Sequence, residues 1–202
     1  MAATEPIRDK NQLKELAGYW LMRGNVRNYT LIVLGACTAL RIGDLLRLKW
    51  EDVFDNNREA FYSHITLSEG KTGKQKAIAI HSFAIQALSL LHKSSNGGNS
   101  NGAVKNGSTN SYIFESTRTP GKPIGRVQAW RVIHEAAGAL DTSNNISCHS
   151  LRKTFGYHAW MSGINPVLIM DIYNHSSYEI TKRYLGVAQD DRDRVYLNLA
   201  LF

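Results

Sequence analysis

Apolar side chains recur at helical spacing along most of the chain. Leu13, Leu16 and Trp20 share one face of a predicted amphipathic helix over residues 9–21. Residues 29–40 are apolar on most faces, which indicates a buried central helix. The same spacing and the helix-end signals predict further helices over residues 43–48, 82–92, 127–140, 149–161, 166–173, 177–184 and 190–199.

One stretch has the alternation of a strand instead. Polar and apolar side chains alternate over residues 61–67, the sequence E-G-K-T-G at 69–73 supplies turn residues, and residues 75–80 return as a second strand. The expected fold is therefore mainly α with a small antiparallel β-hairpin or sheet, an α+β architecture.

The length favours one domain. A domain of 202 residues buries roughly 70% of the surface that its unfolded chain exposes. Residues 94–111 are almost wholly Ser, Asn, Gly and Lys, which is typical of a flexible loop. This loop could be a domain linker, but the apolar segments on both sides look like parts of one core. We therefore expect a single domain over residues 1–202 with an insertion loop at 94–111.

The charge balance favours a polyanionic partner. Lys and Arg number 24 against 17 Asp and Glu, a net charge of +7, and the excess is spread through both halves of the chain. Nucleic acid is the first partner to consider for such a chain, and plain solubility is the alternative.

Other classes of protein are disfavoured. The longest apolar stretch, residues 31–40, is too short to span a bilayer, and the first residues lack the pattern of a secretory signal. Two cysteines, Cys37 and Cys148, cannot form a disulfide framework or a four-cysteine zinc site. Gly70-Lys71-Thr72 ends like a phosphate-binding loop, but Ile65 stands where that motif needs glycine and a strand follows. The seven histidines form no recognisable ligand cluster, so no metal site is predicted.

Candidate chemistry lies instead at helix starts and turns. His149 and Arg152, at i and i+3, share one face near the start of a predicted helix, where they and the backbone N–H groups could bind a phosphate; a solvated helix face is the alternative. Arg41 is flanked by apolar residues at a helix end, and Asp44 could hold it. Lys71 stands in the predicted turn between Gly70 and Gly73. Its side chain is either free to reach away from the body of the protein or that of an ordinary exposed turn lysine.

The last segment of interest is N-H-S-S-Y-E-I-T-K-R-Y-L-G at residues 174–186. Ser176 and Glu179 have the spacing of a capping box, which predicts a helix start. The helix carries Tyr184 and ends at Gly186. From this pattern alone Tyr184 could serve packing or chemistry.

Taken in order, these residues resemble the tyrosine recombinase, or phage integrase, family from about residue 27 to the C-terminus. The order is Arg41 in A-L-R-I-G-D-L, Lys71 in E-G-K-T-G, His149 and Arg152 in H-S-L-R-K-T-F, His175 in N-H-S, and Tyr184 nine residues later.

The resemblance implies the catalytic-domain fold of that family and a site-specific recombinase. Tyr184 would attack a DNA phosphodiester and form a 3′-phosphotyrosine, so that neither metal, cofactor nor ATP is needed. Arg41 and Arg152 would clamp the non-bridging oxygens. Lys71 would protonate the leaving 5′-oxygen, His149 would accept a proton, and His175 would donate to the phosphate. Asp44 would orient Arg41 or His149.

Further expectations concern the DNA and the subunits. Tyr173 and Tyr178 are rival nucleophiles that the family spacing disfavours. Lys122, Arg126 and Arg131 lie in a stretch without acidic residues and are candidate contacts to double-stranded DNA. The tail, residues 187–202, either folds on its own core or docks on a neighbouring subunit of a tetramer on DNA.

The resemblance also has departures and rivals. The family usually carries an N-terminal DNA-binding domain, but only about 25 residues precede the matched region here. Either the protein is naturally short, or the sequence is the catalytic piece of a longer protein. A bacterial or phage protein of this kind would act in the cytoplasm, at the nucleoid. The alternatives are a non-catalytic DNA-binding module of the same fold and a type IB topoisomerase-like enzyme.

Overall fold

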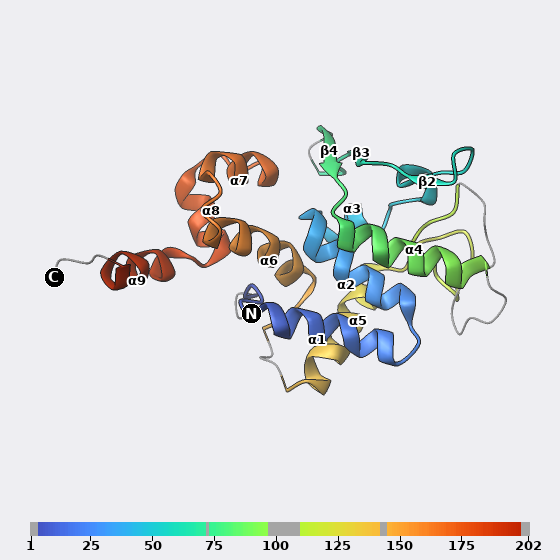
Figure 1. Ribbon diagram of the computed structural model, residues 1–202, viewed down its shortest axis with the longest axis horizontal. Helices are drawn as coiled ribbons and strands as arrows, with labels where there is room; N and C mark the ends of the chain where they lie inside the picture. Colours follow the sequence, from blue (N-terminus) through green and yellow to red (C-terminus); the bar gives the residue numbers. More distant parts are fainter. Residues whose placement is uncertain (1–3, 72, 97–109, 142–144, 199–202) are drawn as a thin grey trace.

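The computed structural model describes residues 4–71, 73–96, 110–141 and 145–198, and helices dominate it (Figure 1). The predicted helices are present with ends shifted by a few residues. In chain order they are α1 (Lys10–Met22), α2 (Val26–Thr38), α3 (Ile42–Leu45), the 3₁₀ helix η1 (Trp50–Asp52), α4 (Ser82–Asn96), α5 (Arg126–Ala139), α6 (Cys148–Met161), α7 (Pro166–Tyr173), α8 (Tyr178–Leu185) and α9 (Ala188–Asn198).

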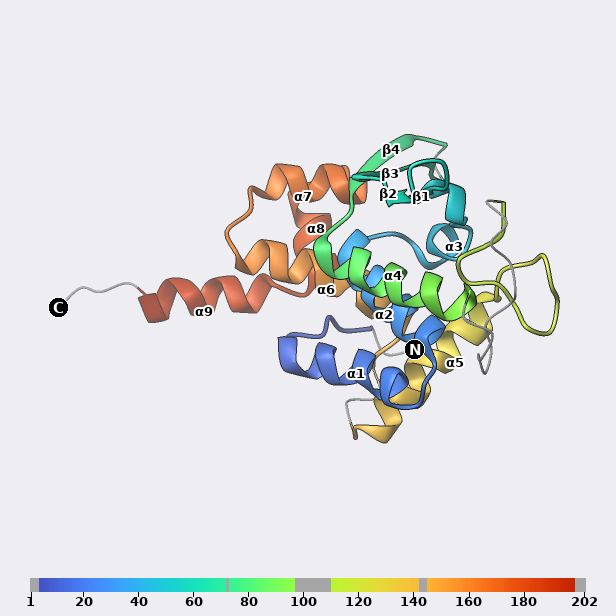
Figure 2. The same ribbon diagram turned by 45° about the vertical axis from the view of Figure 1, so that its right-hand side comes forward.

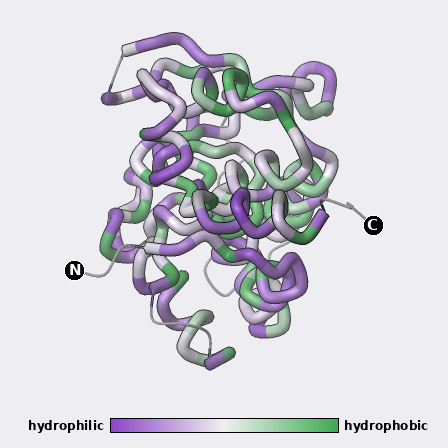
Figure 3. The backbone as a smooth tube through the Cα atoms, turned by 90° about the vertical axis from the view of Figure 1, so that its left-hand side faces the viewer, coloured by the Kyte–Doolittle hydropathy of each residue, from purple (hydrophilic) through white to green (hydrophobic). Residues whose placement is uncertain are grey.

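Helix α2 is the central element, as its apolar sequence predicts. It packs against α1, α4 and α6, and its side chains Leu31, Ile32 and Leu34 are fully buried. The main core gathers around these residues from α1 to the start of α6. A second cluster joins α6, α7 and α8 around Trp160, Ile169 and Leu185. Hydrophobic and hydrophilic stretches alternate along the backbone (Figure 3).

The strand prediction is partly wrong. Residues 61–67 were expected to form one strand, but they are divided between β2 (Ala60–Phe61) and β3 (His64–Ser68). The chain changes partners between them: β2 pairs with β1 (Phe54–Asp55), and β3 pairs with β4 (Gln75–Ala79) in register His64↔Ala79 to Ser68↔Gln75. The rings of Phe54 and Phe61 pack edge to face across the short β1–β2 pair, with centroids 4.9 Å apart.

Helix caps explain several boundaries. Asp9, Ser147 and Asn165 accept hydrogen bonds from the first backbone N–H groups of α1, α6 and α7. The predicted capping box of Ser176 and Glu179 is wrong by one residue. Ser177 is the cap of α8, because its extended backbone lets its Oγ accept from the N–H of Ile180 at 3.2 Å.

The ends of α7 and α8 set up the site. Asn174 ends α7 in the left-handed conformation, with φ 54°, and turns the chain immediately before His175. Gly186 ends α8 in the same way, with φ 71°, as the sequence predicts. The turn at Asn174 therefore fixes the direction in which His175 leaves α7, and the turn at Gly186 ends α8 two residues after Tyr184.

The remaining predicted segments lie at the margins. The first residues of the predicted 94–111 loop extend α4, and residues 97–109 lie outside the described residues. Helix α9 projects away from the body of the molecule (Figures 1 and 2). Residues 199–202 of the tail are likewise outside the described part of the chain. No helix among the described residues is long and apolar enough to cross a bilayer.

A substitution at Gly156 tests the packing of α6 against α7 and α8. A Cβ there would lie 2.5 Å from Leu185 Cδ2 and 2.6 Å from the Tyr173 hydroxyl. We expect Gly156→Ala to lower the free energy of unfolding by about 1–3 kcal/mol. Gly18→Ala, inside α1 with nothing within 4 Å of its Cβ, is the matched control and should raise it by about 0.5–1 kcal/mol. Urea denaturation measures both, and equal effects of the two substitutions would contradict this packing.

Candidate active site

Arg152 is the most deeply placed of the predicted site residues. It lies on α6 with 4% of its surface exposed. Its Nη1 donates to the carbonyl of Ala39, its Nη2 lies 3.5 Å from the carbonyl of Tyr173, and its Cζ is 4.5 Å from the centroid of the Tyr173 ring. Within the described ranges no carboxylate lies within ion-pair distance of Arg152. A buried guanidinium without a carboxylate partner favours an anionic ligand.

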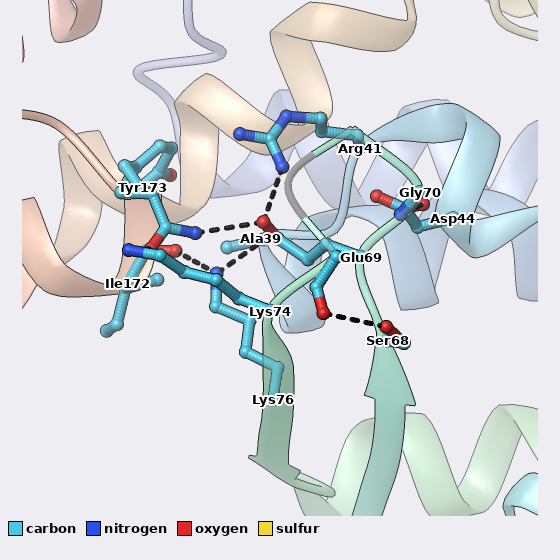
Figure 4. A network of polar contacts seen from close by, with 12 residues as sticks. Ala39, Arg41, Asp44, Ser68, Glu69, Gly70, Lys74, Lys76, Ile172 and Tyr173 are labelled. Carbon is cyan, nitrogen blue, oxygen red and sulfur yellow. Dashed lines mark hydrogen bonds and ion pairs between the residues drawn. The ribbon is translucent and has the colours of Figure 1, made fainter.

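Arg41 approaches the same region from the turn between α2 and α3. It is the N-cap residue of α3, and its backbone is extended. Its Nη1 forms a 2.8 Å ion pair with Oε2 of Glu69, while 26% of the side chain remains exposed. Figure 4 shows one end of the guanidinium directed at Glu69 and the other end directed away from it. Part of the Arg41 fork is thus left for another anion.

Tyr184 lies on α8 beside both arginines. Its ring centroid is 5.1 Å from that of His175 and 5.4 Å from that of Tyr173, and the Nζ of Lys153 lies 5.1 Å from the ring centroid. Burial raises the pKa of Tyr184, while the positive charges of Arg152 and Arg41 act in the opposite direction. The hydroxyl therefore remains protonated at neutral pH, next to cations that favour its ionised form.

The two histidines are held near neutral pH in their uncharged forms. Nδ1 of His175 lies 3.1 Å from Oγ1 of Thr181, which fixes the ring beside Tyr184. Burial, then Arg152 and Arg41, lower the pKa of His175. Burial also lowers the pKa of His149, and so do the neighbouring charges of Arg152, Lys153 and Arg126. Each imidazole can therefore accept a proton at pH 7.

The rival tyrosines have other contacts. Tyr173 is buried, its hydroxyl donates to the carbonyl of Arg152, and burial raises its pKa strongly. Tyr178 is exposed at the first turn of α8, where its ring contacts Trp160 and lies 5.3 Å from Nζ of Lys182. Among the three, Tyr184 combines partial exposure with contact to His175.

Lys71 and Asp44 are placed differently from the others. Lys71 is exposed in the turn between β3 and β4, and the structure shows no contact of its side chain with Tyr184. Asp44 is buried, and its Oδ1 accepts hydrogen bonds from Arg47 and from the N–H of Gly70, at 3.0 Å for the latter. Asp44 was predicted to orient Arg41 or His149. Its carboxylate instead contacts Arg47 and the backbone of Gly70, and so supports the turn that carries Lys71.

A group of residues around Glu69 belongs to the site but was not predicted from the sequence. Its carboxylate contacts Arg41, Lys76 and Asn174. Lys76 occupies a half-buried position of β4 and also donates to the carbonyl of Ile172. A charged residue at an inward position of a strand was the available signal, since such a residue needs a buried partner.

Comparisons with known proteins show which family the chain resembles. The model of the "Phage integrase family" matches residues 8–190. A "Probable integrase/recombinase YoeC" of Bacillus subtilis is 36% identical over 97% of this chain and 97% of its own length. A "Tyrosine recombinase XerD" of Mycobacterium tuberculosis is 25% identical over 79% of this chain, and this chain spans about half, 47%, of its length.

Solved structures agree on the fold. The crystal structure of XerA recombinase superposes with a TM-score of 0.72 at 19% identity, over 100% of this chain and 68% of that one. XerH in its post-cleavage complex with palindromic difH gives 0.69 at 17% identity, over 98% of this chain and 54% of that one. The predicted fold class, mainly α with small antiparallel sheets, is confirmed.

A histidine titration tests the electrostatics of the site. By NMR, we expect His149 and His175 to titrate below the ordinary value of about 6.5. Arg126→Gln should raise the pKa of His149, because it removes one of the cations beside that ring, and should leave His175 unchanged. A pKa of His149 that does not move would show that the charge of Arg126 does not reach the ring, and that burial, Arg152 and Lys153 lower the pKa without it.

Proposed function

Because the chain belongs to the phage integrase family of tyrosine recombinases, we propose that it cleaves and rejoins DNA at specific sites through a covalent bond between Tyr184 and a 3′-phosphate. The family assignment confirms the predicted enzyme class, a site-specific recombinase that breaks and rejoins DNA strands. The observation that carries the proposal is the grouping of Tyr184, His175, Arg41 and the buried Arg152.

The arginines supply the electrostatics of the proposed reaction. A phosphodiester that reaches Tyr184 meets Arg152, which has no carboxylate to neutralise it within the described ranges, and the free part of the Arg41 fork. Guanidinium groups match the geometry of non-bridging phosphate oxygens, and they stabilise the charge that develops there as the Tyr184 oxygen attacks. Phosphorus exchanges the 5′-oxygen for the tyrosine oxygen, so the phosphate ester is conserved and rejoining needs no outside energy.

Proton transfer uses the neutral groups. His149, whose pKa is lowered, is the proposed acceptor for the Tyr184 proton, and His175 is the proposed donor of a hydrogen bond to the phosphate. Lys71 is the proposed acid for the leaving 5′-oxygen. Its place in an exposed turn means that the hairpin or the DNA must bring it to the phosphate.

The remaining expectations are proposals of the same kind. Helix α9 is anchored by a 2.7 Å ion pair of Arg8 with Asp190, but Tyr196 and Leu197 at its far end are more than 80% exposed. This exposure supports docking of the tail on a neighbouring subunit of a tetramer on double-stranded DNA. Such a recombinase would act on DNA in the bacterial cytoplasm.

A trapping experiment tests the nucleophile. Purified protein is mixed with nicked duplexes from a random pool and from the ends of mobile elements, and SDS-resistant protein–DNA adducts are counted. We expect an adduct with wild type and with Tyr178→Phe, and complete loss with Tyr184→Phe, because the phenolic oxygen forms the bond.

Other outcomes separate the alternatives. DNA binding without an adduct in wild type supports the non-catalytic module. An adduct together with relaxation of any supercoiled plasmid, without joining of paired sites, supports the topoisomerase-like enzyme.

Salt dependence tests the DNA contacts. Lys122, Arg126 and Arg131 are all exposed, but Arg126 is the one whose charge reaches His149. We expect Arg126→Gln to weaken DNA binding and to reduce the slope of log K against log salt by about 1. Arg131→Gln, on the same helix but rotated away by its five-residue spacing, is the matched control and should have the smaller effect. Fluorescence anisotropy at several salt concentrations measures both.

A further inference from the structure

A buried carboxylate lies at the junction of three segments that carry site residues. Glu69 directly follows β3, and 1% of its surface is exposed. Its Oε2 is 2.8 Å from Nη1 of Arg41 and 2.9 Å from Nδ2 of Asn174, and its Oε1 is 3.0 Å from Nζ of Lys76 (Figure 4). Two cations and an amide thus surround one carboxylate away from water.

The partners of Glu69 come from distant parts of the chain. Arg41 stands between α2 and α3, and Asn174 ends α7 directly before His175. Glu69 itself is followed by Gly70 and Lys71. One carboxylate therefore joins the segments that hold the first arginine, the hairpin lysine and the second histidine of the proposed site.

The contact also fixes the direction of Arg41. Its Nη1 faces Glu69, and the positive charge of the guanidinium still reaches Tyr184 and His175, where it lowers the pKa of each. A buried carboxylate holds a guanidinium strongly, because water does not compete for either group. Without that charge, a long arginine side chain in a partly exposed turn has several rotamers of similar energy.

We propose that Glu69 is a positioning residue for DNA cleavage: its carboxylate holds Arg41 in the orientation that clamps the scissile phosphate, and ties that arginine to the hairpin and to the end of α7. The proposal rests on the proposed recombinase function. In this proposal Glu69 acts through Arg41 and not on the phosphate itself.

The test compares two buried glutamates. Glu69→Gln keeps the size of the side chain and removes its charge. Glu115→Gln makes the same change at another buried glutamate, which accepts from the N–H of Gly121 and has no contact with Arg41. Single-turnover formation of the covalent adduct is measured on a nicked duplex that wild type cleaves, together with DNA affinity and the thermal midpoint of each variant.

We expect Glu69→Gln to slow adduct formation by about 10- to 100-fold, the loss that a misplaced catalytic group causes, with DNA affinity within about twofold of wild type. Glu115→Gln should cleave at the wild-type rate. An unchanged rate in Glu69→Gln overturns the proposal. Absence of adduct in wild type overturns the proposed function instead.

A double-mutant cycle ties the effect to Arg41. In an Arg41→Lys background, which lacks the guanidinium fork, Glu69→Gln should cause less than about a threefold further loss. The same fold-loss in both backgrounds would show that Glu69 acts independently of Arg41 and would overturn the proposal.

Glu69→Asp is the second variant, for use if Glu69→Gln fails to fold. Its shorter side chain keeps the charge but withdraws it from Arg41, so it should show the same loss of rate.

Discussion

The burial of the Arg152 guanidinium is the constraint on which the rest of the site depends. This charge is held by the carbonyl that ends α2, by the carbonyl that ends α7 and by the face of Tyr173. Helix C-termini carry partial negative charge, so they stabilise the cation without neutralising it as a carboxylate would. Three helices are thereby fixed around a positive charge that retains its attraction for an anion.

Some cations around Arg152 are paired with a carboxylate, whereas Arg152 itself, within the described part of the chain, is not. Glu69 takes up the charge of Lys76 and part of that of Arg41, whereas Arg152 has carbonyl partners. Their separate environments give the two arginines different tasks. Arg152 is rigid because it is buried, and Arg41 is partly exposed and depends on an ion pair for its direction.

The sequence predicts the local parts of this structure better than the long-range ones. The helices and the end of α8 at Gly186 follow from residues close together in the chain. The order of Arg41, His149, Arg152, His175 and Tyr184 follows from a family pattern. Glu69 could not be predicted in this way, because it meets Asn174 across 105 positions and no periodicity records such a pair. The exchange of strand partners at Tyr62 and Ser63 was missed for the same reason, since it depends on Val53 and Ile80.

The connection between α8 and α9 has a mechanical consequence. Gly186 and the fully buried Val187 are the link between the helix of Tyr184 and the projecting helix. The first turn of α9 is fastened to the body through Asp190 to Arg8 and through Asp191 to Trp160 and Lys182. A force on the far end of α9 is therefore borne by these fastenings before it reaches Tyr184. The contacts of Asp190 and Asp191 therefore determine whether a pull on the tail displaces Tyr184 or is absorbed at the base of α9.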